Sequence, residues 1–220
     1  MKQFRYGLKF SKLAPLHFIG HLDLMRLWER AWRRANLPVV YSEGFNPHPK
    51  MSLAQPLAVG LESEAEYLEF YLKVSLAPEA IKKSLSAVLP AGINLEKCFL
   101  IPEKLANLTV LTDTLIYEAE FDIAAGDDEV GTIKNNIAEF LGGRREVKIT
   151  LQRHSQNKDF SLNPHEYIFS CSGGRHLIVT LKIKYREGVP MHAGEIFKAV
   201  CLTPPEKIIR KEIFLKFNFK

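Results

Sequence analysis

Four arginines recur along one short stretch of the chain, and their type and spacing suit them to bind an anion. They are Arg26, Arg30, Arg33 and Arg34, in the stretch "HLDLMRLWERAWRR". On a helix this spacing places them on one side, away from an apolar stripe that includes Leu24 and Trp28. A guanidinium group donates two parallel hydrogen bonds to a phosphate or carboxylate. The pattern indicates either an anion-binding face or an ordinary solvated face, and Glu29 is spaced to pair with Arg33.

A second stretch, "YSEGFNPHPK" at residues 41–50, follows this helix closely. Its two prolines hold the backbone extended, and Gly44 permits a turn that other residues resist. The side chains that could contact a ligand are Phe45, Asn46, His48 and Lys50. RNA-binding proteins stack unpaired bases on aromatic rings and hold the backbone with cations. The alternative interpretation is a structural loop in which Phe45 is buried.

The start of the same helix carries two histidines and an acid, His17, His21 and Asp23. His21 could act as a general acid or base near neutral pH, or it could simply bond to a backbone carbonyl. The free amide groups of the first helical turn are a further anion site. A metal site built from the two histidines and the aspartate is a third interpretation.

Composition indicates a soluble globular protein with a basic first quarter. The chain has 220 residues and a net charge of +5, and residues 1–50 hold nine lysines and arginines against three acids. A local basic zone suggests an anionic partner. No apolar run is long enough to span a membrane, no signal peptide is visible, and the three cysteines have no metal-binding spacing. We therefore expect a cytoplasmic protein without a metal.

The hydrophobic periodicity predicts the same order of elements twice. In the first half, strands are expected at 4–10, 51–59, 66–74 and 93–101, and helices at 21–35 and 78–89. Residues 39–41 form a short extra apolar segment, and residues 102–110 form a connector. In the second half, strands are expected at 115–123, 147–151, 166–172, 175–185 and 207–217, with helices at 130–140 and 193–201 and a polar loop at 154–164. Alternation with period 2 marks the strands, and spacing near 3.6 marks the helices.

This order predicts an α+β protein made of two tandem ferredoxin-like domains, at residues 1–104 and 110–220. Each would have the βαββαβ order, an antiparallel sheet with helices on one face, and an extra short strand. No phosphate-binding loop, dinucleotide fingerprint, HExxH or GxSxG motif occurs. Most enzyme classes that carry a local signature are therefore unsupported.

The motif pair "HLDLMR…ERA.RRA.LP" and "YSEGFNPHPK.S…PL..G..S.AEY", within residues 4–70, resembles the radical-SAM-linked protein family. The resemblance implies a companion protein that is encoded beside, or fused to, a radical SAM and cobalamin-binding protein. Radical SAM enzymes bind a [4Fe–4S] cluster through a CxxxCxxC motif, which the isolated Cys98, Cys171 and Cys201 cannot supply. No cofactor is therefore expected in this chain, and SAM, the cluster and any cobalamin would belong to the partner.

The tandem plan with an N-terminal histidine also resembles, more distantly, the RAMP-type CRISPR RNA endoribonucleases. In those enzymes the first domain supplies a general-base histidine, and a glycine-rich loop near the C-terminus holds the RNA. Residues 202–220 contain no glycine, which departs from that pattern.

These observations lead to one main expectation and two alternatives. The main one is a non-catalytic companion protein of a radical SAM protein. It would bind the substrate, which would be an RNA, either tRNA or rRNA. The residues expected to bind the substrate are His21, Arg26, Arg30, Arg33, Arg34, Phe45, Asn46, His48 and Lys50. The alternatives are a metal-independent endoribonuclease that uses His21, and a protein–protein adaptor that binds no nucleic acid.

Overall fold

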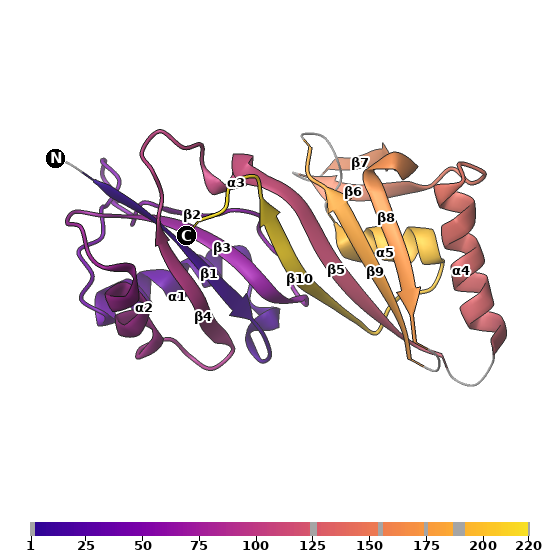
Figure 1. The fold of residues 1–220 in the computed structure, drawn as a ribbon, viewed down its shortest axis with the longest axis horizontal. Helices are drawn as coiled ribbons and strands as arrows, with labels where there is room; N and C mark the ends of the chain where they lie inside the picture. The colour runs from indigo at the N-terminus through magenta and orange to yellow at the C-terminus, as the bar shows by residue number, and fades with distance from the viewer. Residues whose placement is uncertain (1–2, 124–126, 154–155, 174–175, 187–191, 220) are drawn as a thin grey trace. The chain divides into compact units, whose positions relative to one another are not determined.

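The chain folds into two compact units, which we describe separately. The computed structural model describes residues 3–123, 127–153, 156–173, 176–186 and 192–219. Unit 1 consists of Met1–Thr112 together with Glu212–Lys220, and unit 2 is Asp113–Lys211. Figure 1 shows the course of the chain through both units. The domains predicted from the sequence differ from these units, because residues 212–220 return to unit 1 at the end of the chain.

Unit 1 has the strand order of a ferredoxin-like sheet. Its elements are β1 (Phe4–Lys12), a 3-10 turn (Leu16–Phe18), α1 (His21–Arg34), β2 (Met51–Leu53), β3 (Glu62–Leu72), α2 (Pro78–Ser86), β4 (Ile93–Leu100) and the short α3 (Leu108–Leu111). The sheet runs β4-β1-β3 with β2 paired to β3, and the pairs β1–β3, β1–β4 and β2–β3 are antiparallel. The predicted α+β class and the βαββαβ order are confirmed.

Unit 2 repeats this plan with an added hairpin. Its elements are β5 (Thr112–Asp122), α4 (Asp127–Leu141), β6 (Lys148–Arg153), β7 (Gln156–Ser161), a 3-10 turn (Pro164–Glu166), β8 (Tyr167–Ser172), β9 (His176–Lys184), α5 (Ala193–Cys201) and β10 (Lys207–Leu215). The strand order is β10-β5-β9-β8, and β6 and β7 form a separate two-stranded sheet. Strand β10 begins in unit 2 and ends in unit 1.

The hairpin corrects the polar loop expected at 154–164. Most of that segment is strand β7, which pairs with β6 from Lys148 opposite Ser161 onwards, while residues 154–155 lie outside the described part. The sequence pattern missed β7 because its residues are mostly polar and show little apolar alternation. Ile149 and Leu151 of β6 are buried, so in this hairpin it is β6 that supplies core contacts.

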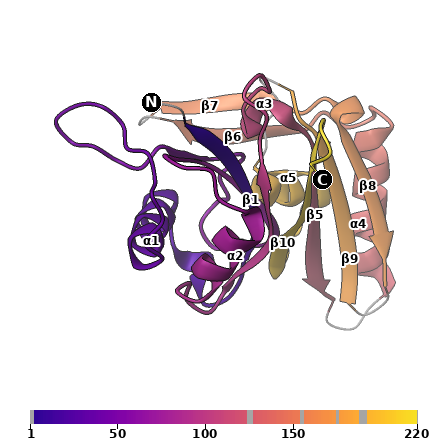
Figure 2. The ribbon, with the colours of Figure 1, turned by 60° about the vertical axis from the view of Figure 1, so that its left-hand side comes forward.

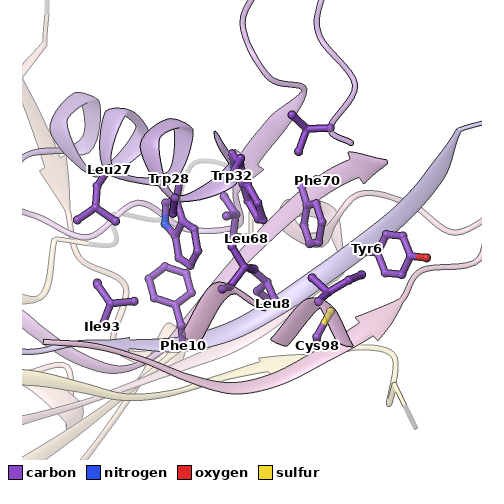
Figure 3. Close-up of a cluster of buried hydrophobic side chains, with 14 of the residues drawn as sticks. Tyr6, Leu8, Phe10, Leu27, Trp28, Trp32, Leu68, Phe70, Ile93 and Cys98 are labelled. Atoms are coloured by element: carbon purple, nitrogen blue, oxygen red, sulfur yellow. The ribbon is translucent and has the colours of Figure 1, made fainter. Parts of the chain in front are cut away.

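The core of unit 1 lies between α1, α2 and one face of the sheet. Trp28 and Trp32 of α1 are fully buried and stack on each other with ring centroids 5.4 Å apart. Trp28 meets Phe10 of β1 edge-on at 5.0 Å, and Trp32 stacks on Phe70 of β3 at 4.6 Å (Figure 3). These contacts fix the rotation of α1 about its axis, and therefore decide which of its side chains face outward.

A second apolar cluster covers the opposite face of the same sheet. It contains Ala54, Phe99, Ile101, Leu108, Leu111 and Phe219. Phe99 stacks on Phe219, and its ring fills the space above Gly7, where an added Cβ would clash with the ring. In unit 1 this part of the sheet is thus covered by α3 and the C-terminal segment, and it offers no open platform for a ligand.

Candidate anion-binding surface

The local sequence of α1 determines where the helix begins and ends. Gly20 precedes it in an extended conformation, and Asp23 in the first turn complements the positive end of the helix dipole. At the other end Asn36 adopts a left-handed φ of 51°, a conformation that asparagine tolerates, and Pro38 follows. The inward face consists of Leu24, Leu27, Trp28, Ala31 and Trp32, all buried.

The four arginines of α1 lie on the outward side, as the spacing predicted. Arg26, Arg30, Arg33 and Arg34 are all exposed. Three of them, at positions 26, 30 and 34, form one row with a rise of about 6 Å between successive members, and Arg33 lies beside it. Arg26 pairs with Asp23 at 3.1 Å, with both side chains about two-thirds exposed. For Arg30, Arg33 and Arg34, no carboxylate partner is found among the residues that the structure describes.

The loop at residues 41–50 is tied together at its base. Val39 bridges to Leu72 of β3, and Tyr41 bridges to Pro49 across the loop. The amide of Ser42 donates to the carbonyl of His48 at 2.7 Å, and the amide of His48 donates to Oγ of Ser42 at 3.0 Å. Only residues 43–47 extend beyond these cross-links, and Gly44 turns the chain there with a φ of 125°. The loop projects from unit 1 near α1 (Figure 2).

The tip of this loop presents an aromatic ring to solvent. The relative exposure of Phe45 is 106%, so its ring packs against none of the residues that the structure describes. The alternative interpretation, in which Phe45 is buried, is therefore wrong. Asn46 and His48 are exposed as well, and Lys50 is half-buried where the loop returns to the body of the unit.

One contact brings the loop to the helix. Nδ1 of His48 lies 3.4 Å from Oε1 of Glu29, a pair that becomes ionic when the imidazole is protonated. The spacing allowed Glu29 to pair with Arg33, but its carboxylate lies against His48 instead. Arg26 and Arg33 lie three residues before and four after Glu29, on the same strip of helix surface. The arginine side of α1 and the loop are thus neighbours in unit 1.

His21 is not part of this arrangement. It is the first residue of α1, with an exposed side chain, and lies about 12 Å along the helix axis from Glu29. His17 is half-buried, and its ring lies against Phe18 with centroids 3.9 Å apart. In the described part of the chain, no three His, Cys, Asp or Glu side chains are grouped so that they could bind a metal.

Several of the cationic side chains in residues 1–50 are paired with acids or buried inside unit 1. Arg5 pairs with Glu69 at 2.7 Å, and Lys9 pairs with both Glu96 and Glu212. Lys12 is buried, with Nζ 3.0 Å from the carbonyl of Ile19. A hollow of about 520 Å³ beside Arg5 and Tyr71 therefore has its cation already paired. The exposed cations left in this quarter are chiefly those of α1.

The cysteines are poor candidates for chemistry. Burial raises the pKa of Cys98 to about 12, and burial together with Cys171 has the same effect on Cys201. Burial also raises the pKa of Cys171, which is only half-buried. The thiolate is the form that attacks substrates and binds metals, so these thiols are largely unreactive at neutral pH. Separately, none of the helices in the described residues has the length and apolar character needed to cross a lipid bilayer.

Comparison with solved structures finds a chain from "Crystal Structure of a Cbf5-Nop10-Gar1 Complex" at 10% sequence identity and a TM-score of 0.45. The similarity covers 93% of the present chain and 48% of that chain, so our chain spans about half of its length. No curated protein matches the sequence. Residues 5–193, which include both α1 and the 41–50 loop, match the family described as "Uncharacterized protein conserved in bacteria (DUF2344)", and the chain belongs to this family.

Proposed function

We propose that this chain is a non-catalytic RNA-binding protein, with tRNA or rRNA as its substrate. The binding surface consists of the outward arginines of α1 and the side chains of the 41–50 loop, and we call it the α1–loop surface. Arg26, Arg30, Arg33 and Arg34 bind phosphates, and Phe45, Asn46, His48 and Lys50 contact the nucleotides that the phosphates join. His21 lies at the far end of α1 and contacts RNA only if the strand continues along the helix.

The observation that carries the proposal is the set of exposed guanidinium groups beside a protruding aromatic loop. Arg30, Arg33 and Arg34 have no carboxylate partner among the described residues, so a phosphate displaces no internal ion pair. Arg26 does pair with Asp23, but the pair is exposed, and such pairs contribute only about 0–1 kcal/mol. A phosphate can therefore compete for this guanidinium at small cost.

The acids on the same surface set the expected strength of binding. Asp23, Glu29 and Glu43 lie among the cations, so the field is mixed rather than uniformly positive. Phosphate contacts release counterions, and affinity then falls with rising salt in proportion to the number of contacts. We expect binding of moderate affinity with a clear dependence on salt.

The first test is a double substitution, Arg30→Ala with Arg34→Ala. Alanine preserves the helix because it has the highest helix propensity, and both side chains are exposed. Each phosphate contact contributes about 0.7 to the slope of log K against log salt for a single strand and about 0.9 for a duplex, so the loss of two contacts should lower the slope on tRNA by roughly 1.4 to 1.8. Fluorescence anisotropy of labelled total tRNA over a salt series measures this slope.

The matched control removes the same charge elsewhere in unit 1, at Lys83 and Lys104. Both lysines are exposed and lie outside α1 and the loop. The control variant should keep the slope of the unaltered protein. If both double variants change the slope equally, binding follows net charge rather than the α1–loop surface, and if the unaltered protein binds no RNA the proposal fails.

The partner we propose is a radical SAM protein, which would carry out the chemistry on the RNA. The support is that the motif pair within residues 4–70 resembles the radical-SAM-linked protein family; its first half contains α1, and its second half begins with the 41–50 loop. Chemical crosslinking in cells, followed by identification of the attached proteins, should recover a radical SAM protein. A set of partners without such a protein would favour the alternative of an adaptor with another role.

A further inference from the structure

We infer that the tip of the 41–50 loop recognises an unpaired nucleotide, with Phe45 stacking on its base. This inference rests on the proposed RNA function and narrows the substrate to RNA with a single-stranded loop, bulge or end. An uninterrupted duplex would bind only through its phosphates. Phe45 would then be the residue that determines this specificity.

The first support is how completely Phe45 is exposed. A single exposed apolar side chain is common on protein surfaces, but Phe45 has all of its ring in water at the end of a loop. Its sequence neighbours Gly44 and Asn46 offer no apolar contact. The whole apolar area of the ring can therefore be removed from water when a ligand stacks on it.

The second support is that the loop is held in one shape before a ligand binds. The hydrogen bonds between Ser42 and His48 close it, and the contact of His48 with Glu29 fixes it beside α1. Pro47 and Pro49 restrict the backbone further. Ordering a flexible loop costs affinity, so a loop of defined shape presents its ring at low entropic cost.

The third support is the chemistry around the ring, which favours a nucleotide over other partners. An unpaired nucleotide joins an aromatic face to a phosphate, and here Phe45 is followed by the exposed Asn46 on a loop that the His48–Glu29 contact joins to the arginine-bearing helix α1. A tip that inserts into a membrane would need further apolar residues beside Phe45, where Gly44 and Asn46 stand. In duplex RNA the base faces are covered by stacking, and the deep major groove excludes side chains.

The test compares two RNAs of equal charge, a short single strand of mixed sequence and a blunt duplex with the same number of phosphates. Removing a stacking ring typically costs a factor of roughly 5 to 150 in affinity. We expect Phe45→Ala to weaken binding of the single strand by this factor and to change binding of the duplex less than about twofold, with the salt slope preserved.

Two further variants separate stacking from general apolar contact. Phe45→Leu keeps much of the apolar area without an aromatic face, so it should lose single-strand binding almost as fully as alanine. Phe214→Ala removes another exposed phenylalanine of unit 1, 51% exposed on β10, and should have no effect. Anionic phosphatidylserine vesicles form a third arm; the arginines of α1 can attract the protein to them, but this association should not change in Phe45→Ala.

The outcomes distinguish this inference from the proposed RNA-binding function on which it rests. Equal loss for single strand and duplex in Phe45→Ala, or full binding by Phe45→Leu, would overturn stacking while leaving RNA binding intact. Vesicle binding that depends on Phe45, without an effect on single-stranded RNA, would assign the ring to a membrane surface and would also overturn it. If the unaltered protein binds neither RNA, both the proposed function and this inference fall together.

Discussion

Replacing Glu69 with alanine is expected to lower the free energy of unfolding of unit 1 by about 3–5 kcal/mol, because it leaves a buried cation without its partner. The side chains of Arg5 and Glu69 are only 10% and 5% exposed. Two guanidinium nitrogens of Arg5 donate to the two carboxylate oxygens, and Glu69 also accepts from the hydroxyl of Tyr71 and the amide of Leu108. One substitution therefore releases four hydrogen bonds.

The electrostatics of this cluster support the size of the expected effect. Burial opposes the charge on Arg5, but the hydrogen bond to Glu69 and its negative charge outweigh burial, so the pKa of Arg5 is raised. Arg5 stays protonated at every pH at which the protein is folded, and it cannot escape the lost partner by releasing its proton. The loss of stability should therefore be nearly independent of pH in the neutral range.

Urea denaturation followed by tryptophan fluorescence reports the unfolding of unit 1. The chain contains two tryptophans, Trp28 and Trp32, and both lie in this unit. Glu103→Ala is the control, since Glu103 is exposed and its loss should change stability by less than about 0.5 kcal/mol. The double variant Arg5→Met with Glu69→Leu should be more stable than Glu69→Ala, since it leaves no unpaired charge. A cost below about 1 kcal/mol for Glu69→Ala would contradict the role of this pair.

Replacing Trp28 with alanine should cost a similar amount, about 3–5 kcal/mol, for a different reason. Trp28 is fully buried between Phe10 and Trp32, so its removal leaves a large cavity at the centre of the unit 1 core (Figure 3). Trp28→Phe should cost only about 1–2 kcal/mol because most of the volume remains. It also removes an indole Nε1 for which no acceptor is found among the described residues.

The remaining Trp32 reports unfolding in both Trp28 variants. Its own ring stacks on Phe70, so its emission should shift when the core opens. Phe18→Ala provides the control, because Phe18 is 70% exposed and its removal opens no cavity. Equal stability of Trp28→Ala and the unaltered protein would mean that α1 does not depend on this contact for its orientation. The outward direction of the arginines would then lack its structural cause.

The order of helices and strands could be predicted from the sequence because it depends on local patterns. The segment 193–201 is the helix α5 as predicted, and α1 ends one residue before the predicted Ala35. Alternation along 66–74 located most of β3, whose strand begins earlier, at Glu62. Strand β7 was not predicted, because a hairpin strand of mostly polar residues shows no apolar alternation.

The candidate site could be predicted only in part, because side-chain pairing depends on residues far apart in the sequence. Helical spacing alone placed the four arginines on the outward side of α1. The sequence could not show that Arg5 meets Glu69, that Lys9 meets Glu212, or that Glu29 meets His48 rather than Arg33. A count of charges in residues 1–50 therefore overstated the number of cations available to a ligand.

The interpretation of the 41–50 loop changed most between sequence and structure. Its prolines and glycine predicted a shaped loop, but the burial of Phe45 could not be decided from neighbouring residues. Burial depends on whether another segment folds over the ring, and in this structure the relative exposure of Phe45 is 106%. The same limit applied to the sheet of unit 1, whose second face is covered by Phe219 and α3 from distant parts of the chain.

Ultraviolet crosslinking of the protein to RNA in cells, with mass spectrometry of the RNA-bearing peptides, tests the central claim most directly. The α1–loop surface predicts that crosslinked nucleotides concentrate on peptides from residues 21–34 and 41–50, with Phe45 as a major site. The Arg30→Ala, Arg34→Ala variant should lose most of these crosslinks. Crosslinks that concentrate on α2 or on unit 2, and that persist in this variant, would contradict the claim.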